Sequence, residues 1–130
     1  MILLDTHTII WLLIAPEDLS RHAKEAVLQA RRDGRTIAYS PVSLYEIANA
    51  ARRGRLKLYT ATEDFIRLVE GRLDLASLTA KITVCAGQLP EPFHGDPIDR
   101  IIAATAIVND CTLITHDIKI RDANVCKTLW

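Results

Sequence analysis

Apolar residues in this chain fall into short uninterrupted runs and into longer stretches where they recur every three or four positions. The short runs are typical of strands buried on both faces, and the longer stretches are typical of helices. Strands that alternate with helices indicate an α/β fold, with a parallel sheet covered by helices on both faces. The strands are expected at 2–4, 36–39, 74–78, 112–115 and 124–129.

Capping residues predict where several helices begin. Ser20, Ser40 and Asp96 each precede a helical pattern, and Pro41 and Pro97 occupy first helical positions. Glycines close two of the helices, where a left-handed backbone ends the pattern. The helices are expected at 8–14, 21–33, 41–53, 62–71, 80–89 and 97–109.

Composition is that of an ordinary globular protein. The 130 residues, 49% hydrophobic and 25% charged, suit one domain over 1–130. No apolar run reaches the roughly 18 residues of a membrane span, and Asp5 interrupts a start that lacks the basic leader of a signal peptide. Cys85, Cys111 and Cys126 are odd in number without metal-ligand spacing, so we expect buried thiols in a cytoplasmic protein.

Sixteen basic and sixteen acidic residues give a net charge of zero, which argues against a nonspecific nucleic-acid coat. The charge is uneven, however. If five of the acids shared one pocket, the remaining surface would carry sixteen basic and eleven acidic residues and would be positive. A polyanionic substrate therefore stays possible. The local basic groups are Arg31, Arg32 and Arg35, and Arg52, Arg53, Arg55 and Lys57.

Two aspartates follow predicted strands, Asp5 after ILL and Asp117 after TLITH. Either one alone is as well explained as a loop aspartate. Because the carboxyl ends of parallel strands meet at one edge of a sheet, we expect the two to lie near a common crevice. The hydroxyls of Thr6 and Thr115 flank them and could orient carboxylates or water.

The segment FHGDPIDRIIAATA (93–106) contributes two more acids at the start of a helix that is apolar almost all round. Such a helix is buried against the sheet, so its N-terminus is expected beside Asp5. Asp96 suits an N-cap, and Arg100 could pair with it, whereas Asp99 lies just before the apolar segment IIAATA. Glu46, judged on pattern alone, is a boundary residue of its helix.

If Asp5, Asp99 and Asp117 converge, the repulsion between their carboxylates must be offset. Two unit charges 4 Å apart cost on the order of 4 kcal/mol at an effective dielectric of 20. Protonation, an arginine or a bound cation would offset that cost. Carboxylate oxygens without clustered Cys or His select Mg²⁺ or Mn²⁺, which can activate water at a phosphodiester. The residues therefore predict a metal-dependent phosphoryl-transfer or hydrolysis site.

Four segments taken in order, LLDTHTIIWLL, SPVSLYEIANAARRGRL, FHGDPIDRIIAATA and TLITHD, resemble the PIN-domain nucleases, and most closely the VapC-type toxins of bacterial toxin–antitoxin pairs. The likeness covers essentially the whole chain. The four acids of that family correspond to Asp5, Glu46, Asp99 and Asp117 as catalytic residues. The resemblance implies that Asp5, Asp99 and Asp117 bind the metal.

The resemblance further implies a three-layer α/β/α fold with about five parallel strands. It implies a Mg²⁺- or Mn²⁺-dependent endoribonuclease that acts on RNA, forms a homodimer and is inhibited by a cognate antitoxin. Asp96 is extra to the four-acid pattern and is a cap, a supporting group or an occasional ligand. Thr6 and Thr115 stand where the family often has a hydroxyl beside the acids.

The histidines near the acids, His7, His94 and His116, are expected to be structural or on the surface, because neighbours of an acid on a strand point to the opposite face. Trp11 is expected in the core or in a dimer interface, and Trp130 is expected to be exposed to a partner.

Arg52, Arg53 and Arg55 follow Glu46 on the same helix, and two interpretations stay open. They are a solvated last turn that suits the helix dipole, or they contact the phosphates of RNA.

Two other classes compete with the nuclease. A receiver-like phosphoacceptor has an acidic pocket but needs a lysine at a late strand end, which TLITHD lacks. A phosphatase of the haloacid-dehalogenase kind needs a second acid two residues after the first, where this chain has His7.

Overall fold

The computed structural model describes residues 1–90, 93 and 95–130. The strands are β1 (Ile2–Leu4), β2 (Ile37–Tyr39), β3 (Asp74–Leu75), β4 (Thr112–Ile114) and β5 (Thr128–Leu129). The α-helices are α1 (Thr6–Ile14), α2 (Arg21–Arg32), α3 (Pro41–Arg52), α4 (Thr62–Arg72), α5 (Ala80–Gly87), α6 (Pro97–Val108) and α7 (Ile118–Ala123). A 3₁₀ turn, η1, covers Pro16–Asp18.

The described strands form one parallel sheet in the order β3-β2-β1-β4-β5. From central β1 the chain moves outward through β2 and β3, then returns on the other side of β1 as β4 and β5. The direction of winding therefore reverses between β1 and β4. Open parallel sheets form their ligand crevice at such a reversal, beyond the carboxyl ends of the strands.

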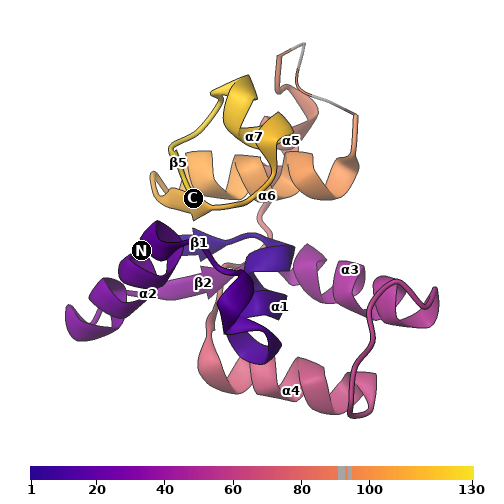
Figure 1. Cartoon of the computed structure of the whole chain (residues 1–130). Helices are drawn as coiled ribbons and strands as arrows, with labels where there is room; N and C mark the ends of the chain where they lie inside the picture. Colours follow the sequence, from indigo (N-terminus) through magenta and orange to yellow (C-terminus); the bar gives the residue numbers. More distant parts are fainter. Residues whose placement is uncertain (91–92, 94) are drawn as a thin grey trace.

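Helices cover both faces of the sheet, with α5, α6 and α7 on one side and α1 and α4 on the other (Figure 1). Successive strand residues point to opposite faces. Leu4 and Ile114 pack in the core beneath α1 to α4, while Leu3 and Leu113 pack against α6. The expected three-layer α/β/α fold with five parallel strands is confirmed.

Helix α6 lies against the sheet along an unusually buried surface. Residues 102–106 are all buried, as the run IIAATA predicts. Three of them are alanines, whose small side chains let the helix approach the strands closely. The helix runs antiparallel to the strands, so Pro97 lies at their carboxyl edge, where the crevice forms.

Most helix ends agree with their caps. The Ser20 hydroxyl accepts a hydrogen bond from the N–H of Ala23 at 3.0 Å. Helix α1 begins at Thr6 rather than Thr8, because Asp5 occupies its N-cap. Ser40 precedes α3 as expected, but its hydroxyl makes no capping hydrogen bond.

The C-terminal region differs from the prediction of a strand over 124–129. Helix α7 fills 118–123, and Asn124 ends it with a left-handed φ of 51°. That backbone conformation cannot continue into a strand, so β5 is confined to Thr128–Leu129. Six residues are too few for a helical period to stand out in the sequence.

Several other expectations concern individual residues. Cys111 is buried and Cys85 and Cys126 are half-buried, all three as free thiols. Pro90 and Pro92 predict a loop in the sequence, and Pro92 lies outside the described residues. Among the helices of the described ranges, none is long and apolar enough to cross a bilayer.

Candidate active site

Asp5 lies in the crevice directly after β1, with 5% of its surface exposed. Its Oδ1 accepts from the backbone N–H of Thr6 at 2.7 Å, and its Oδ2 accepts from the hydroxyl of Thr115 at 2.7 Å. Burial raises the pKa of Asp5, and these two hydrogen bonds oppose the rise. The carboxylate is thereby fixed in one orientation.

Thr115 connects Asp5 to Asp117, the acid that follows β4. Its hydroxyl donates to Asp5 and accepts from the backbone N–H of Asp117 at 3.0 Å. Asp117 also caps α7, where its Oδ1 accepts from the N–H of Lys119 at 2.7 Å. One residue therefore caps a helix and brings a carboxylate to the crevice.

Glu46 reaches the same crevice from α3. The hydroxyls of Thr6 and Ser43 hydrogen-bond at 3.0 Å and join α1 to α3. Burial raises the pKa of Glu46; a hydrogen bond from Thr6 lowers it, and the charge of Asp5 raises it. Glu46 thus lies within electrostatic reach of Asp5, although its sequence pattern marks it only as a boundary residue.

The two acids of GDPID occupy different environments. Asp96 is exposed and caps α6, with Oδ1 accepting from the N–H groups of Ile98 at 2.9 Å and Asp99 at 3.3 Å. Asp99 is half-buried, and its pKa is raised to about 8. Burial is the main cause of that rise, followed by the charges of Asp5, Asp96, Glu46 and Asp117.

The raised pKa of Asp99 therefore reflects the convergence of several acidic side chains on one carboxyl group. All four of the other candidate acids act on this one carboxyl group. They come from the ends of β1 and β4, from α3 and from the start of α6. The crevice gathers them from segments up to more than a hundred residues apart in sequence.

Helical spacing would allow Arg100 to pair with Asp96, but the described contacts of its guanidinium are with backbone carbonyls. Its guanidinium donates to the carbonyl oxygens of Ala86 at 3.0 Å, Leu89 at 2.9 Å and Phe93 at 3.4 Å. It also lies over the ring of Phe93, 5.8 Å from the centroid. Arg100 thereby ties the end of α5 and the segment after it to the first turns of α6, where Asp96 and Asp99 lie.

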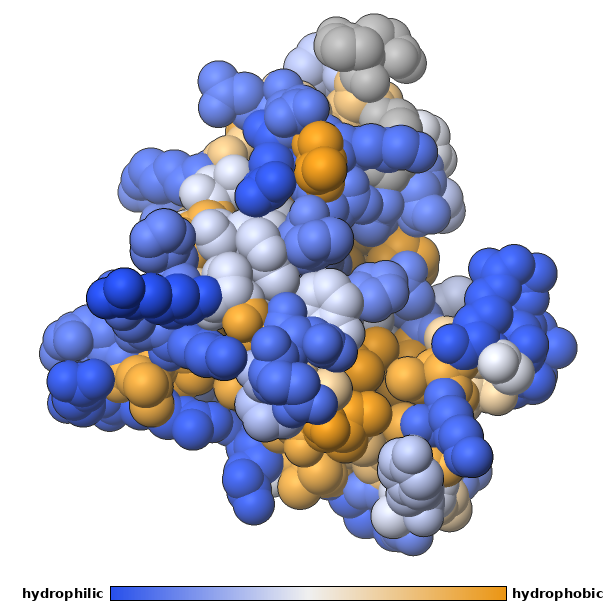
Figure 2. All heavy atoms as spheres, in the orientation of Figure 1, coloured by the Kyte–Doolittle hydropathy of each residue, from blue (hydrophilic) through white to orange (hydrophobic). Residues whose placement is uncertain are grey.

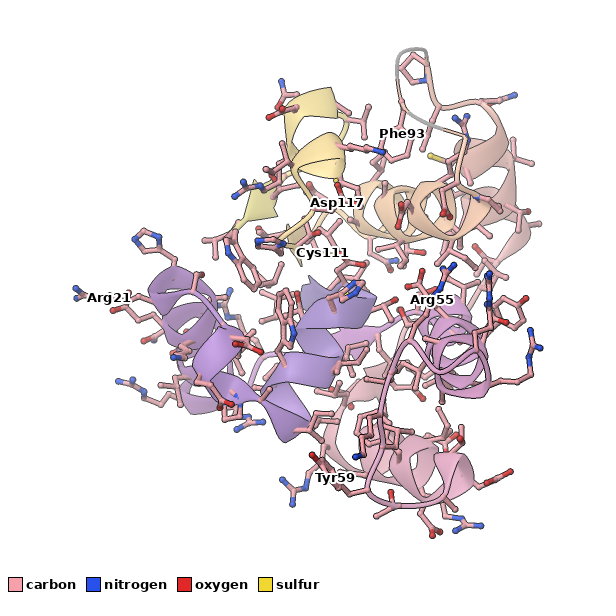
Figure 3. The ribbon with its side chains drawn as sticks, turned by 45° about the vertical axis from the view of Figure 1, so that its right-hand side comes forward. Arg21, Arg55, Tyr59, Phe93, Cys111 and Asp117 are labelled. Atoms are coloured by element: carbon pink, nitrogen blue, oxygen red, sulfur yellow. The ribbon has the colours of Figure 1, made fainter. Side chains whose placement is uncertain are left out.

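Two hollows open beside the acids. The first, about 440 Å³, is lined by Asp5, Asp117 and Lys119 together with neighbouring rings. The second, about 540 Å³, is lined by Glu46 and Asp96 among others, with Arg53 and Arg55 along it. Figure 3 shows Asp117 where α7 begins and Arg55 just beyond α3.

The three arginines after Glu46 are therefore not equivalent. Arg53 and Arg55 line the second hollow. Arg52 is exposed and donates to Oδ1 of Asn49 at 2.9 Å, and the described lining does not include it. Arg53 and Arg55 thus border a hollow beside the acids, and contact between the three arginines and the phosphates of RNA stays a prediction.

The aromatic residues lie close to the acids. His7 and His116 are exposed, as expected, whereas His94 lies outside the described residues. Trp11 is half-buried and packs on the core beneath α1. Trp130 is half-buried as well, more than its terminal position suggests, because it packs on Trp11 and His116.

The donor atoms at the crevice suit a hard divalent cation. They are carboxylate and hydroxyl oxygens. The imidazole of His7 lies near enough to act on the charges of Asp5 and Glu46. Within the described ranges, no three His, Cys, Asp or Glu side chains are already arranged as a metal-binding group. Carboxylates that repel one another stay apart until a cation draws them together. The match to a divalent cation therefore rests on the type of donor atom and not on the present distances between the side chains.

Comparison with known proteins agrees with this fold. Residues 2–125 match the PIN domain family. The chain is 31% identical to Ribonuclease VapC22 of Mycobacterium tuberculosis over 120 residues, which covers 92% of this chain and 89% of that protein. The chain therefore belongs to the PIN-domain family.

Solved structures share the fold. VapBC2 from Rickettsia felis bound to a promoter DNA fragment aligns with a TM-score of 0.75 and 21% identity, over 99% of this chain and 98% of that one. DNA-bound VapBC from Salmonella typhimurium aligns with a TM-score of 0.70 and 21% identity, over the same shares of the two chains. At this identity the likeness concerns the fold alone.

Sequence reasoning missed two residues that support the site. Ser43 lies one turn before Glu46 on the same face of α3, and this spacing could have revealed it. Arg100 gave no such signal, because its partners are backbone carbonyls, which have no pattern in a sequence.

Proposed function

We propose that this protein is a Mg²⁺- or Mn²⁺-dependent endoribonuclease, the toxin of a type II toxin–antitoxin pair. The observation that supports it most is the gathering of Asp5, Glu46, Asp96, Asp99 and Asp117 at the reversal point of a parallel sheet, expressed in the raised pKa of Asp99. Membership of the PIN-domain family and the likeness to a ribonuclease agree with it. The two competing classes, the receiver-like phosphoacceptors and the phosphatases of the haloacid-dehalogenase kind, are different families from the PIN domain that this chain matches.

Each residue has a distinct role in the proposed site. Asp5, Asp99 and Asp117 hold the cation, and Glu46 completes the catalytic acids. Thr115 holds Asp5 and Asp117 in register, and Thr6 supports Glu46. A bound divalent cation would activate water and offset the charge that develops on the phosphodiester.

Cleavage of RNA by the purified protein tests this proposal. We expect cleavage in Mg²⁺ that stops with EDTA and with Asp5→Ala. Since Asp5 is also the N-cap of α1, Asp5→Asn serves as a second variant that retains a capping oxygen. Undiminished cleavage in EDTA would overturn the metal-dependent mechanism.

We further propose that the protein acts in the cytoplasm as a homodimer that a cognate antitoxin inhibits. The structural relatives named above are VapBC proteins bound to DNA, and a toxin–antitoxin complex from Klebsiella pneumoniae shares the fold with a TM-score of 0.67 and 21% identity. Apolar side chains gather over α1 and the surface beside it, unusual for a lone chain (Figure 2). Ile14 there is 40% exposed.

Co-expression with the product of the neighbouring open reading frame tests the partner. We expect a stable complex that no longer cleaves RNA. Copurification without inhibition, or a neighbouring gene that encodes no small DNA-binding protein, would contradict the toxin–antitoxin assignment.

A further inference from the structure

We propose that the ring cluster, defined as His7, Trp11, His116 and Trp130, binds an unpaired base of the RNA beside the cleavage site. The inference rests on the proposed ribonuclease function and names its substrate class, a single-stranded segment or loop. It arises from the position and exposure of the rings, which the acidic site does not use.

The four rings form one continuous cluster around Trp11. The centroid of Trp11 lies 5.7 Å from that of His7, 5.4 Å from that of His116 and 5.4 Å from that of Trp130. The rings of His116 and Trp130 are 5.1 Å apart at 72°. These are tilted and edge-to-face arrangements, and His7 and His116, which are exposed, leave ring surface that a further partner can contact.

The ring cluster stands between the two hollows and beside the acids. His7 and Trp11 line both hollows, and His116 lines the first together with Asp5 and Asp117. A strand whose phosphate lies at the acids would therefore place a neighbouring nucleotide against these rings. Lys119 lines the same hollow and supplies a positive charge for an adjoining phosphate.

The chemistry favours an unpaired nucleotide over a duplex. Aromatic side chains bind bases by stacking on their flat faces, which pairing and stacking in a double helix hide. Stacking tolerates any base, so the ring cluster would select for single-stranded form more than for sequence.

A purely structural role explains only half of the ring cluster. Packing between Trp11 and Trp130 attaches the end of the chain to α1. His7 and His116 contact these indole rings as well, but both histidines are exposed, so most of their ring surface is not needed for that attachment. Replacing His116 therefore distinguishes base binding from a purely structural role, because this exposed residue is not part of the described hydrophobic core.

The test measures binding of a fluorescent single-stranded oligoribonucleotide to the full chain carrying Asp99→Asn, so that the RNA stays uncleaved. His116→Ala is compared with His116→Phe, which keeps a ring, and with His22→Ala, which removes an exposed histidine on α2. A series of oligonucleotides that lack one base at a time locates the stacked nucleotide.

We expect His116→Ala to weaken binding on the order of 10-fold, and His116→Phe and His22→Ala to bind like the parent. Removing the base at one position should weaken the parent similarly and leave His116→Ala unaffected. If no position is coupled to His116 while the unmodified protein still cleaves RNA, the ring cluster does not bind a base and the ribonuclease proposal stands. If the unmodified protein neither binds nor cleaves RNA, both proposals are overturned.

Discussion

Single residues in this site combine structural and chemical tasks. Asp5, Asp96 and Asp117 each occupy the N-cap of a helix. Asp5 and Asp117 are also proposed ligands of the cation, so capping and catalysis are not alternatives. Asp99 differs from them, because it stands inside the first turn of α6, where burial and the charges of the other four acids raise its pKa to about 8. The difference gives two predictions for single substitutions.

Asp96→Ala should lower the free energy of unfolding by about 1 kcal/mol, because α6 loses the acceptor of two N–H groups. Asp99→Asn should leave stability unchanged or raise it in metal-free buffer, since it removes a carboxyl group from an acidic surrounding. Urea denaturation near neutral pH measures both. The reverse order of stabilities would mean that the two aspartates have exchanged roles.

Stability of the metal-free protein should fall as pH rises from about 4 to about 8. Over that interval the folded chain retains a proton on Asp99, whose pKa is raised to about 8, while the unfolded chain has released it. The contribution is complete below the unfolded pKa and is lost as pH approaches the folded one. Burial raises the pKa of Asp5 and Glu46 as well, which adds in the same direction.

Thermal unfolding in EDTA at about pH 6 and about pH 8 measures this effect. Asp99→Asn should show a smaller fall between the two pH values than the unmodified protein. Excess Mg²⁺ should restore stability at the higher pH, because a cation favours the ionised acids. An equal fall in both proteins would contradict the pKa assigned to Asp99.

At the scale of elements, the start of α6 is held by Arg100 and by burial of its apolar sides. The burial follows from the sequence, because IIAATA leaves no polar side to face water. The attachment to α5 does not follow from the sequence, because the guanidinium of Arg100 donates to three backbone carbonyls, and backbone carbonyls have no pattern in a sequence. Helix α7 was missed for a related reason: its cap, Asp117, looks in the sequence like an acid at a strand end.

Arg100→Met should lower the free energy of unfolding by roughly 2 kcal/mol or more, because partly buried carbonyl oxygens lose a charged donor. Arg21→Met is the matched control, since Arg21 pairs with Glu25 on the exposed side of α2 and its removal should change stability little. Chemical denaturation compares them. Equal effects would show that the carbonyl contacts of Arg100 do not stabilise the fold.

At the scale of the whole molecule, alternating strands and helices were enough to predict the parallel sheet and a crevice at its carboxyl edge. Asp5 and Asp117 could be assigned to that crevice because both follow strands. The residue pattern alone did not place Glu46 there, because its position depends on the packing of α1 against α3, which the Thr6–Ser43 hydrogen bond reflects. The family resemblance was what indicated Glu46. That residues 1–130 form a single domain stays a prediction, and one cooperative unfolding transition would support it.

The most direct test of a metal-dependent acidic site is RNA cleavage by Asp99→Asn and Asp96→Ala, measured side by side in Mg²⁺ at a temperature where both are folded. We expect Asp99→Asn to lose activity on the order of 100-fold or more, because it removes a proposed ligand of the cation. Asp96→Ala should retain most of its activity. Cleavage by Asp99→Asn at the rate of the unmodified protein would contradict the assignment of the active site.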